Sequence, residues 1–265
     1  MSEYEEPTLF DSMVKPKLSP AYPDRAPWGT SVSLRAWQAE AMKKYFETNP
    51  RDFMAVATPG AGKTTFVRLI LNEISTDKGT IVVAGKDITR LSRREIPELR
   101  QKIGMVFQDF RLLEKKTVYE NVAFAMEVVH AKRKDIRSQV PYVLDLVGIL
   151  DKQDRYPNEL SAGEQQRVGI ARAIVNNPRV LIADEPTGNL DPITAMEIME
   201  ILDKINLRGT TILMVTHAKD IVDQMNKRVV AIEDGHIVRD EQGQYGFYNE
   251  EEYYDYDEGV DKYVF

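Results

Sequence analysis

A glycine-rich turn is the segment of this sequence best suited to hold phosphate. The turn, TPGAGKTT at 58–65, follows an apolar run at 53–57 that is short enough to be a buried strand, and a helical apolar pattern follows at 66–71. Small residues let backbone N–H groups wrap around phosphate oxygens, and the start of a helix favours negative charge. We therefore predict a phosphate-binding loop whose binding residues are Gly60, Ala61, Gly62, Lys63, Thr64 and Thr65.

Three side chains of this loop have distinct predicted roles. Lys63 reaches the β- and γ-phosphates of a nucleotide, the Thr64 hydroxyl ligates Mg²⁺, and Thr65 faces the α-phosphate. Ala57 stands where the G-x-x-x-x-G-K-[ST] pattern has its first glycine, which is tolerable if φ is negative there. The alternative is a chance glycine turn before a helix.

Two adjacent carboxylates follow a second apolar run, at 180–183. Asp184, at the end of a buried strand, is suited to hold Mg²⁺ directly or through water. Glu185 would then project toward the γ-phosphate and take a proton from the attacking water. The alternative is a strand end closed by two solvated acids, which is common for an isolated pair but weak beside a phosphate loop.

Two further polar residues end short apolar runs. Gln108 closes the run at 104–107, and His217 closes the run at 210–216. Taken alone, each is an ordinary polar residue at a strand end. We interpret His130 and His236, which lack such a context, as surface or helix residues.

Three segments in a fixed order resemble the ABC-type ATPases: LSAGEQQR at 160–167, VLIADEP at 180–186 and GNLD at 188–191. The resemblance implies ATP and Mg²⁺ as ligands, and a homodimer in which Ser161 and Gly163 close over nucleotide held by a second copy. It also implies that Gln108 is a Mg²⁺ ligand that senses the γ-phosphate, and that His217 contacts the γ-phosphate. Asp191 is assigned to the nucleotide site on the same basis.

The same resemblance implies an α/β fold with a RecA-like P-loop NTPase core and a helical subdomain at 110–160. The domain spans 34–240. Residues 1–33 are proline-rich and are expected to be extended or disordered. The acidic, tyrosine-rich tail at 241–265 is interpreted as solvated and disordered, with a regulatory or partner-binding role as the alternative.

Two local patterns complete the expected core. A turn signal at 234–235 between the apolar runs 229–232 and 236–238 predicts a hairpin. Apolar residues at helical spacing after Pro192 predict a core-facing helix. These apolar positions are Ile193, Met196, Ile198, Met199, Ile201, Leu202 and Ile205.

The opening of the chain departs from the ABC pattern. LRAWQAEA at 34–41 and RDFMAVATPGAGKTT at 51–65 resemble the adenine-reading and first phosphate motifs of superfamily-two helicases. The sequence therefore resembles two families joined at a shared phosphate loop. The N-terminal antiparallel β subdomain is expected to be incomplete, because the partner strand of 81–83 is missing.

The composition of the chain limits which kinds of partner are expected. A formal net charge of −7 over 265 residues argues against a nucleic-acid-wrapping surface, so no nucleic acid is expected. The absence of cysteine excludes disulfides and thiol catalysis, and suits a reducing compartment. No apolar stretch approaches the roughly 18 residues of a membrane span, and the amino terminus lacks a signal-peptide core. Membrane association would therefore require a partner protein.

Three functions remain. The first is an ABC-type ATPase that drives a membrane protein on the cytoplasmic face; residues 66–245 resemble the cell-division branch of the family, whose partner controls peptidoglycan hydrolases. The second is a helicase fragment, although about 75 residues after Asp191 are too few for a further RecA-like domain. The third is an ATP-binding module without competent turnover.

Overall fold

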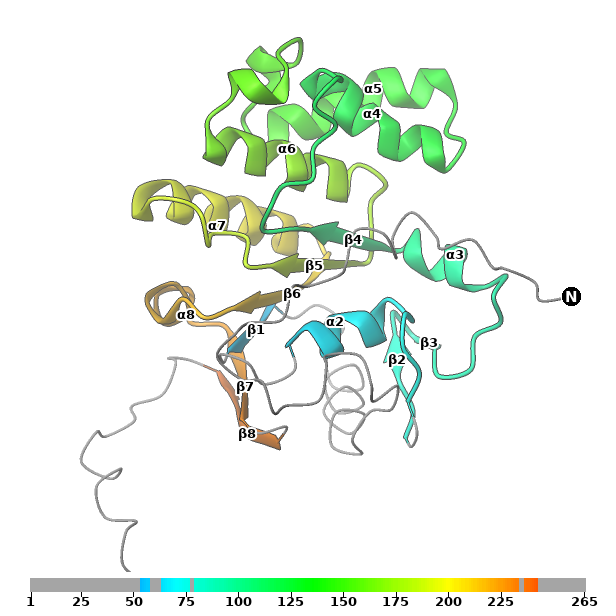
Figure 1. Cartoon of the computed structure of the whole chain (residues 1–265), viewed down its shortest axis with the longest axis vertical. Coiled ribbons are helices and arrows are strands. Elements are labelled where there is room, and N and C mark those ends of the chain that lie inside the picture. Colours follow the sequence, from blue (N-terminus) through cyan, green and yellow to red (C-terminus); the bar gives the residue numbers. More distant parts are fainter. Residues whose placement is uncertain (1–52, 58–62, 77–78, 234–235, 243–265) are drawn as a thin grey trace, which may run out of the picture. The chain divides into compact units, whose positions relative to one another are not determined.

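The computed structural model describes residues 53–57, 63–76, 79–233 and 236–242 (Figure 1). The chain divides into two units, 1–33 and 34–265, and every described residue belongs to the second. The predicted helicase-like segment at 34–41, the three loop residues 60–62 and residues 243–265 of the predicted acidic tail lie outside the described residues. Glu241 and Gln242, predicted to begin that disordered tail, instead end a strand of the sheet, because they pair with a neighbouring strand. Within the described part of the chain, no helix combines the length and apolar character needed to cross a bilayer.

A six-stranded sheet forms the centre of the second unit. Its strands lie in the order β4 (Ile103–Val106), β5 (Val180–Asp184), β6 (Thr211–Thr216), β1 (Phe53–Ala57), β7 (Arg228–Glu233) and β8 (His236–Gln242). Neighbours from β4 to β7 are parallel, and β8 is antiparallel to β7. The predicted α/β class is confirmed, as is the hairpin at 229–238.

The register of the sheet aligns the ends of its central strands. Asp184 pairs with Val215, and Ala57 pairs with Thr216. Parallel strands present their carboxyl ends at one edge, so the residues that follow β4, β5, β6 and β1 emerge side by side. This edge is where the sequence places its polar residues.

Alternate residues of the central strands face two hydrophobic cores. Leu181 and Ala183 pack in a cluster that includes Ile198 and Leu202 of α7 (Pro192–Leu207). Val180 and Ile182 pack in a second cluster with apolar residues of α2 (Lys63–Ile70). The period of two in a strand explains the division, and both faces of the sheet are therefore covered by helices.

A group of helices follows β4 along the chain. It contains α4 (Val118–Val128), α5 (Arg133–Leu146), the 3-10 turns η1 (Leu150–Lys152) and η2 (Pro157–Glu159), and α6 (Ala162–Ile174). In Figure 1, α4 and α5 lie against α6, and α6 in turn contacts α7 and β4. Most of the predicted helical subdomain at 110–160 is indeed helical.

Local hydrogen bonds fix the start of α4. The Thr117 hydroxyl accepts from the Glu120 N–H, and the Glu120 carboxylate accepts from the Thr117 N–H, which is a capping box. The fully buried Asn121 side chain donates to three backbone carbonyls and accepts from the N–H of Leu113 at 2.7 Å. The loop before α4 is therefore held by a buried amide with all its polar atoms paired.

A short antiparallel ladder joins β2 (Val82–Val83) and β3 (Lys86–Asp87) through Ala84 and Gly85, which have φ of 51° and 78°. Two consecutive positive φ values are typical of a tight hairpin turn. The strand at 81–83 thus pairs with the residues that follow it. The prediction that an N-terminal partner strand is missing concerns residues before β1, which lie outside the described residues.

Two further short helices, α3 (Ile96–Arg100) and α8 (Lys219–Met225), complete the described elements. The prediction for α7 needs one correction. Ile193, predicted to face the core, is 76% exposed. It lies in the first turn of the helix, where no described element covers it.

Candidate active site

Four predicted site residues meet at the carboxyl edge of the sheet. Gln108 lies two residues after β4, Asp184 ends β5, Glu185 follows it, and His217 follows β6. Because β4, β5 and β6 are adjacent and parallel, these residues come together from three separate parts of the chain. The loop after β1 starts beside β6, at the same edge. The described part of the predicted site is therefore gathered along this edge.

Glu185 and His217 are joined directly. Nδ1 of His217 lies 2.7 Å from Oε1 of Glu185, a hydrogen bond in which the protonated ring nitrogen donates to the carboxylate. The Glu185 side chain is 12% exposed and the His217 side chain 61%. The more exposed ring thus holds a largely buried carboxylate in one orientation.

The backbone at Glu185 is also constrained. Its φ is 47°, in the left-handed region that few non-glycine residues adopt. Its N–H donates to the carbonyl of Val215 at 2.8 Å, so the strand pairing continues one residue past β5. Left-handed backbone outside glycine is concentrated at functional sites, and here it re-aims the side chain that follows Asp184.

Gln108 lies against the loop that joins β5 to α7. Its carbonyl accepts from Nδ2 of Asn189 at 3.3 Å. A Cβ on Gly188 would lie 3.1 Å from Nε2 of Gln108, so only a residue without a side chain fits there without displacing the amide. The GNLD segment is therefore folded onto Gln108.

The donor set at this edge fits Mg²⁺. The described residues contain no group of three or more His, Cys, Asp or Glu side chains that could hold a metal ion. Mg²⁺ commonly takes one or two carboxylates, phosphate oxygens and waters. One carboxylate from Asp184 and one amide oxygen from Gln108, together with phosphate oxygens of a nucleotide, match that preference. Thr64 lies in the first turn of α2, and its side chain is outside the description.

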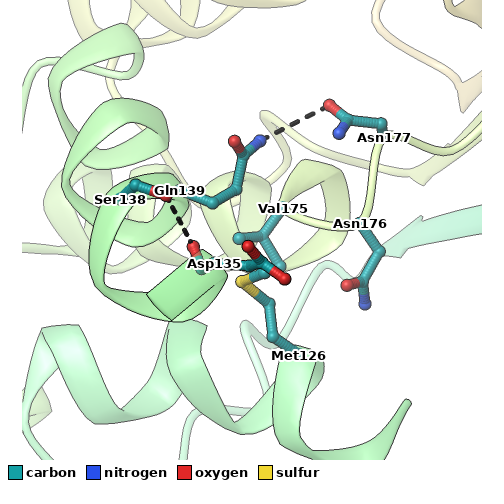
Figure 2. Close-up of a pocket in the computed structure, with 7 residues that line it drawn as sticks. All are labelled: Met126, Asp135, Ser138, Gln139, Val175, Asn176 and Asn177. Atoms are coloured by element: carbon teal, nitrogen blue, oxygen red, sulfur yellow. Dashed lines mark hydrogen bonds between the residues drawn. The ribbon is translucent and has the colours of Figure 1, made fainter. Parts of the chain in front are cut away.

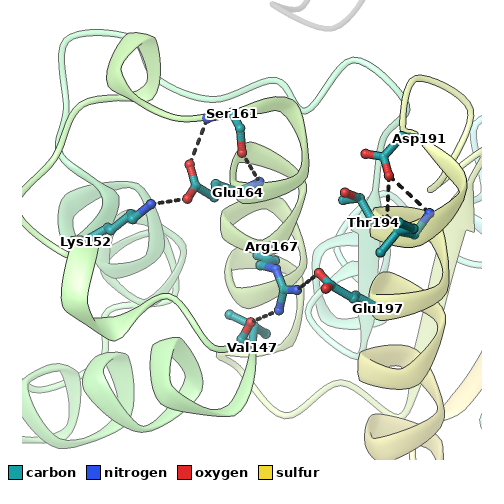
Figure 3. Close-up of polar contacts among 9 residues, drawn as sticks. Val147, Lys152, Ser161, Glu164, Arg167, Asp191, Thr194 and Glu197 are labelled. Carbon is teal, nitrogen blue, oxygen red and sulfur yellow. Dashed lines mark hydrogen bonds and ion pairs between the residues drawn. The ribbon is translucent and has the colours of Figure 1, made fainter.

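The amino end of α6 is exposed and capped by its own residues (Figure 3). The Ser161 hydroxyl accepts from the N–H of Glu164 at 3.4 Å, and the Glu164 carboxylate accepts from the N–H of Ser161 at 2.8 Å. Lys152 pairs with the same carboxylate. These hydrogen bonds, that from Lys152 first, lower the pKa of Glu164 below 4.5. The predicted helix start at Ala162 is confirmed.

Comparison with known proteins identifies the family. The family model described as ABC transporter matches residues 55–188. The cell division ATP-binding protein FtsE of Streptococcus pneumoniae serotype 2 is 56% identical over 200 residues, which are 75% of this chain and 87% of FtsE. FtsE of Bacillus subtilis is also 56% identical, over 76% of this chain and 89% of its own length.

The chain belongs to the ABC transporter family.

Solved structures agree with this assignment. A dimeric post-hydrolysis state of the ATP-binding cassette MJ0796, bound to ADP and Pi, has a TM-score of 0.63 and 31% identity over 73% of this chain and 86% of its own. The cassette cbiO1 from Clostridium perfringens has a TM-score of 0.68 and 33% identity over 72% and 77%. The predicted P-loop NTPase fold and the ATPase class are confirmed. These matches do not test the helicase-like interpretation of the opening segment.

Within this ABC ATPase, Gly163 has a role that the sequence did not reveal. It is buried, and a Cβ built on it would lie 2.3 Å from Cγ2 of Thr194 in α7. The sequence offered a glycine that lets a phosphate approach the backbone. The structure adds that glycine is needed for α6 and α7 of the same chain to pack.

Asp191 caps the next helix. Its Oδ1 accepts from the N–H groups of Ile193 and Thr194 at 3.1 and 3.0 Å (Figure 3). The hydrogen bonds to Thr194 are the main cause of a lowered pKa for this carboxyl. Asp191 therefore stabilises α7, and its assignment to the nucleotide site stays a prediction.

Two side chains, Gln166 and Arg167, tie α6 to its surroundings through contacts that were not found from the sequence. Gln166 is fully buried and donates through Nε2 to the carbonyl of Pro186 at 2.7 Å. Arg167 donates to the carbonyl of Val147 and to Glu197, both at 2.7 Å (Figure 3). In the sequence, the QQR triplet is recognisable only as part of the LSAGEQQR motif, and no sequence signal distinguishes these structural roles.

A cavity of about 320 Å³ lies apart from these residues. Figure 2 shows its lining, which comes from α4, α5 and the segment after α6: Met126, Asp135, Ser138, Gln139, Val175, Asn176 and Asn177. None of the predicted site residues lines it, and two of its polar groups already pair with each other, Gln139 with Asn177 at 3.5 Å. We assign it no role in ATP hydrolysis.

Proposed function

We propose that this chain is the ATP-hydrolysing subunit of a cell-division complex, which dimerises on ATP and drives a membrane protein resembling FtsX. The observation that carries the proposal is the meeting of Gln108, Asp184, Glu185 and His217 at the sheet edge beside β1. The names of the relatives, cell division ATP-binding protein FtsE, support the cellular role.

Glu185 acts as the general base for hydrolysis. Its carboxylate takes a proton from a water while the water oxygen bonds to the γ-phosphorus, and the bond from that phosphorus to the ADP oxygen breaks. His217 holds the carboxylate through the 2.7 Å hydrogen bond, so Glu185 is already oriented before substrate arrives.

The other residues bind and orient ATP. Lys63 at the start of α2 reaches the β- and γ-phosphates, and the amides of residues 60–62 surround them. Thr64, Asp184 and Gln108 hold Mg²⁺, with Gln108 also reaching the γ-phosphate. Mg²⁺ bound there neutralises charge on the phosphate oxygens. Thr65 faces the α-phosphate.

The exposed end of α6 completes the site of a second copy. Ser161 is exposed, and the Glu164 carboxylate beside it is paired with Lys152, so little uncompensated negative charge faces outward. A helix start of this kind favours an anion. The dimeric state of the MJ0796 structures supports a pair of chains here. In the proposed pair, each α6 end faces the γ-phosphate bound by its partner.

The relatives' names and the net charge support the proposed partner and location. We propose a peripheral position on the inner face of the cell membrane, bound to the FtsX-like protein. A formal net charge of −7 gives no support to a nucleic-acid partner. Single-stranded DNA or RNA should therefore leave the ATPase rate unchanged.

A subunit-mixing experiment tests the dimeric site. Ser161→Asp keeps an N-cap of the preferred type but places a carboxylate against the partner's γ-phosphate. The Ser161→Asp chain should still bind ATP but lose turnover. Ser161→Asn is an equally good cap but carries no charge, so this variant should lose much less of its ATPase activity. Gly163 is unsuitable as a probe, because any side chain there clashes with Thr194.

Lys63→Ala supplies the complementary defect, because it removes the cation that binds phosphate. A mixture of Lys63→Ala and Ser161→Asp chains forms heterodimers with one intact composite site, and part of the ATPase activity should return. The rate per chain of the natural sequence should rise with protein concentration. A Ser161→Asp chain that hydrolyses ATP at the normal rate would overturn the shared site, and ATP binding without turnover by the natural chain would favour the non-cycling module.

A further inference from the structure

The segment that follows Gln108 contains two consecutive residues in the left-handed conformation. Phe110 and Arg111 have φ of 57° and 48°. Side chains disfavour this region, so a pair of non-glycine residues there is a strained arrangement. The N–H of Arg111 donates to the carbonyl of Asp109 at 2.6 Å, which closes a three-residue turn around Phe110. A positive φ at the centre of such a turn marks its rarer form.

One side chain of α6 holds this turn. Arg172 donates through Nη2 to the carbonyl of Phe110 at 2.7 Å and through Nη1 to the carbonyl of Arg111 at 2.5 Å. The planar guanidinium can address both carbonyls at once, which the single ammonium of lysine cannot do with the same geometry. Burial lowers the pKa of Arg172, so its charge has exchanged water for these two carbonyls.

Gln108 lies next to the turn in the sequence, and nearby side chains hold this segment of the chain. The guanidinium of Arg111 lies 4.1 Å from the centre of the Phe107 ring and pairs with Asp109 at 3.1 Å. In the sequence, Gln108 lies between Phe107 and Asp109, and Nδ2 of Asn189 donates to its carbonyl. We therefore expect a change in the turn to displace Gln108.

The same helix carries the end that faces a second copy. Ser161 and Arg172 are 11 positions apart, which is roughly 16 Å along an α-helix. A rigid α6 thus connects the exposed cap at one end with the turn beside Gln108 at the other.

We propose that Arg172 is a positioning residue, which holds the strained Phe110–Arg111 turn and thereby keeps Gln108 in place for Mg²⁺ and the γ-phosphate. The proposal deepens the proposed function, because it depends on the role assigned there to Gln108. Arg172 touches neither nucleotide nor metal and acts through the turn.

The test measures ATP affinity of the full chain by calorimetry, once with Mg²⁺ and once with EDTA. Arg172→Met keeps an unbranched stem of similar length and removes the donors. It should lower affinity for ATP with Mg²⁺ about tenfold and leave affinity in EDTA nearly unchanged. Gln108→Ala should show the same selective loss. Arg137→Met, an exposed arginine on α5, is the control and should change neither value.

A second substitution that restores ATP affinity distinguishes a positioning role of Arg172 from a general packing role. Glycine adopts positive φ without a steric penalty, so Phe110→Gly in the Arg172→Met chain should recover most of the Mg²⁺-dependent affinity. If Arg172→Met does not fold, Arg172→Lys replaces it, with a smaller selective loss expected. An equal loss with and without Mg²⁺, or no recovery with Phe110→Gly, would overturn the proposal.

A stability measurement distinguishes a failure of this proposal from a failure of the proposed function. Unchanged Mg²⁺ dependence in Gln108→Ala would overturn the role of Gln108 in the proposed function. The link between Arg172 and the turn is then judged by urea unfolding alone. The stability lost in Arg172→Met should be regained with Phe110→Gly if the arginine offsets strain in the turn, and should stay lost if it does not.

Discussion

The sheet edge and the amino end of α6 present their polar groups in different ways. At the sheet edge, Glu185 is largely buried and is held by His217, which follows the neighbouring strand and is 32 positions away. At the end of α6, Ser161 is exposed and is held by Glu164, three positions along its own helix. The first group is positioned by tertiary contacts, as the proposed chemistry on ATP bound by its own chain requires. The second is preformed locally and exposed, which suits a group used by another molecule.

The neighbouring helix α7 makes the distinction sharper. Both helices begin with a side-chain cap, but α7 uses the carboxylate of Asp191, whose charge already compensates the helix dipole. The cap of α6 is a neutral hydroxyl, and its nearby carboxylate is paired with Lys152. Of these two helix starts, that of α6 is the better anion site. Four predictions test this comparison.

The largest effect is expected at the sheet edge. Glu185→Gln should lower the ATPase rate by about 10²–10⁴-fold, because an amide cannot take the proton from water. ATP affinity should be retained, since repulsion from the γ-phosphate is relieved, and the variant should accumulate as an ATP-bound dimer on a sizing column. Glu200→Gln, an exposed change on α7, is the control. Normal turnover in Glu185→Gln would remove this residue as the base.

The contact between α6 and α7 comes next. Gly163→Ala should lower the free energy of unfolding by about 1–3 kcal/mol, the usual cost of overpacking, because the new Cβ meets Cγ2 of Thr194 at 2.3 Å. Thr194→Ser removes that methyl, and the next atoms lie at 3.7 and 3.9 Å. The double variant should therefore unfold in urea close to the natural chain. Failure of Thr194→Ser to restore stability would contradict the packing role of Gly163.

A smaller effect is expected at the residue that orients the base. His217→Ala should lower turnover about tenfold, the scale of one hydrogen bond to a charged group. The loss should stay well below that of Glu185→Gln, and in a Glu185→Gln background His217→Ala should add little. Full additivity of the two changes, measured as ATPase rates, would show that His217 acts independently of Glu185.

The smallest effect concerns the cap of α6. The folded state lowers the pKa of Glu164 below its ordinary 4.5. Its stabilising contribution is therefore complete above pH 4.5 and is lost as pH falls through the folded-state pKa. Glu164→Gln should reduce stability by less than about 1 kcal/mol at neutral pH. The difference from the natural chain should shrink in urea unfolding at acid pH. A difference that stays constant with pH would exclude this carboxylate as its source.

The sequence by itself determined the elements and the edge at which the chemistry lies. The apolar runs that end at Asp184 and before His217 form strands within one residue of their predicted bounds, because burial in a parallel sheet imposes a continuous local pattern. The start of α6 also depends on a local arrangement, because its capping box joins Ser161 and Glu164, three positions apart. Ile193 was misassigned because helical spacing identifies a face but not where along the helix that face leaves the core.

Only the tertiary structure decided which side chains work together. The hydrogen bond from Arg172 to Phe110 joins residues 62 positions apart, and the clash that makes Gly163 necessary involves a residue of another helix. No local pattern specifies such pairs, because they depend on the packing of α6 against α7 and against the turn after β4. The strained backbone at Phe110 and Arg111 was hidden for the same reason: neither residue type favours positive φ, and it is the surrounding fold that holds them there.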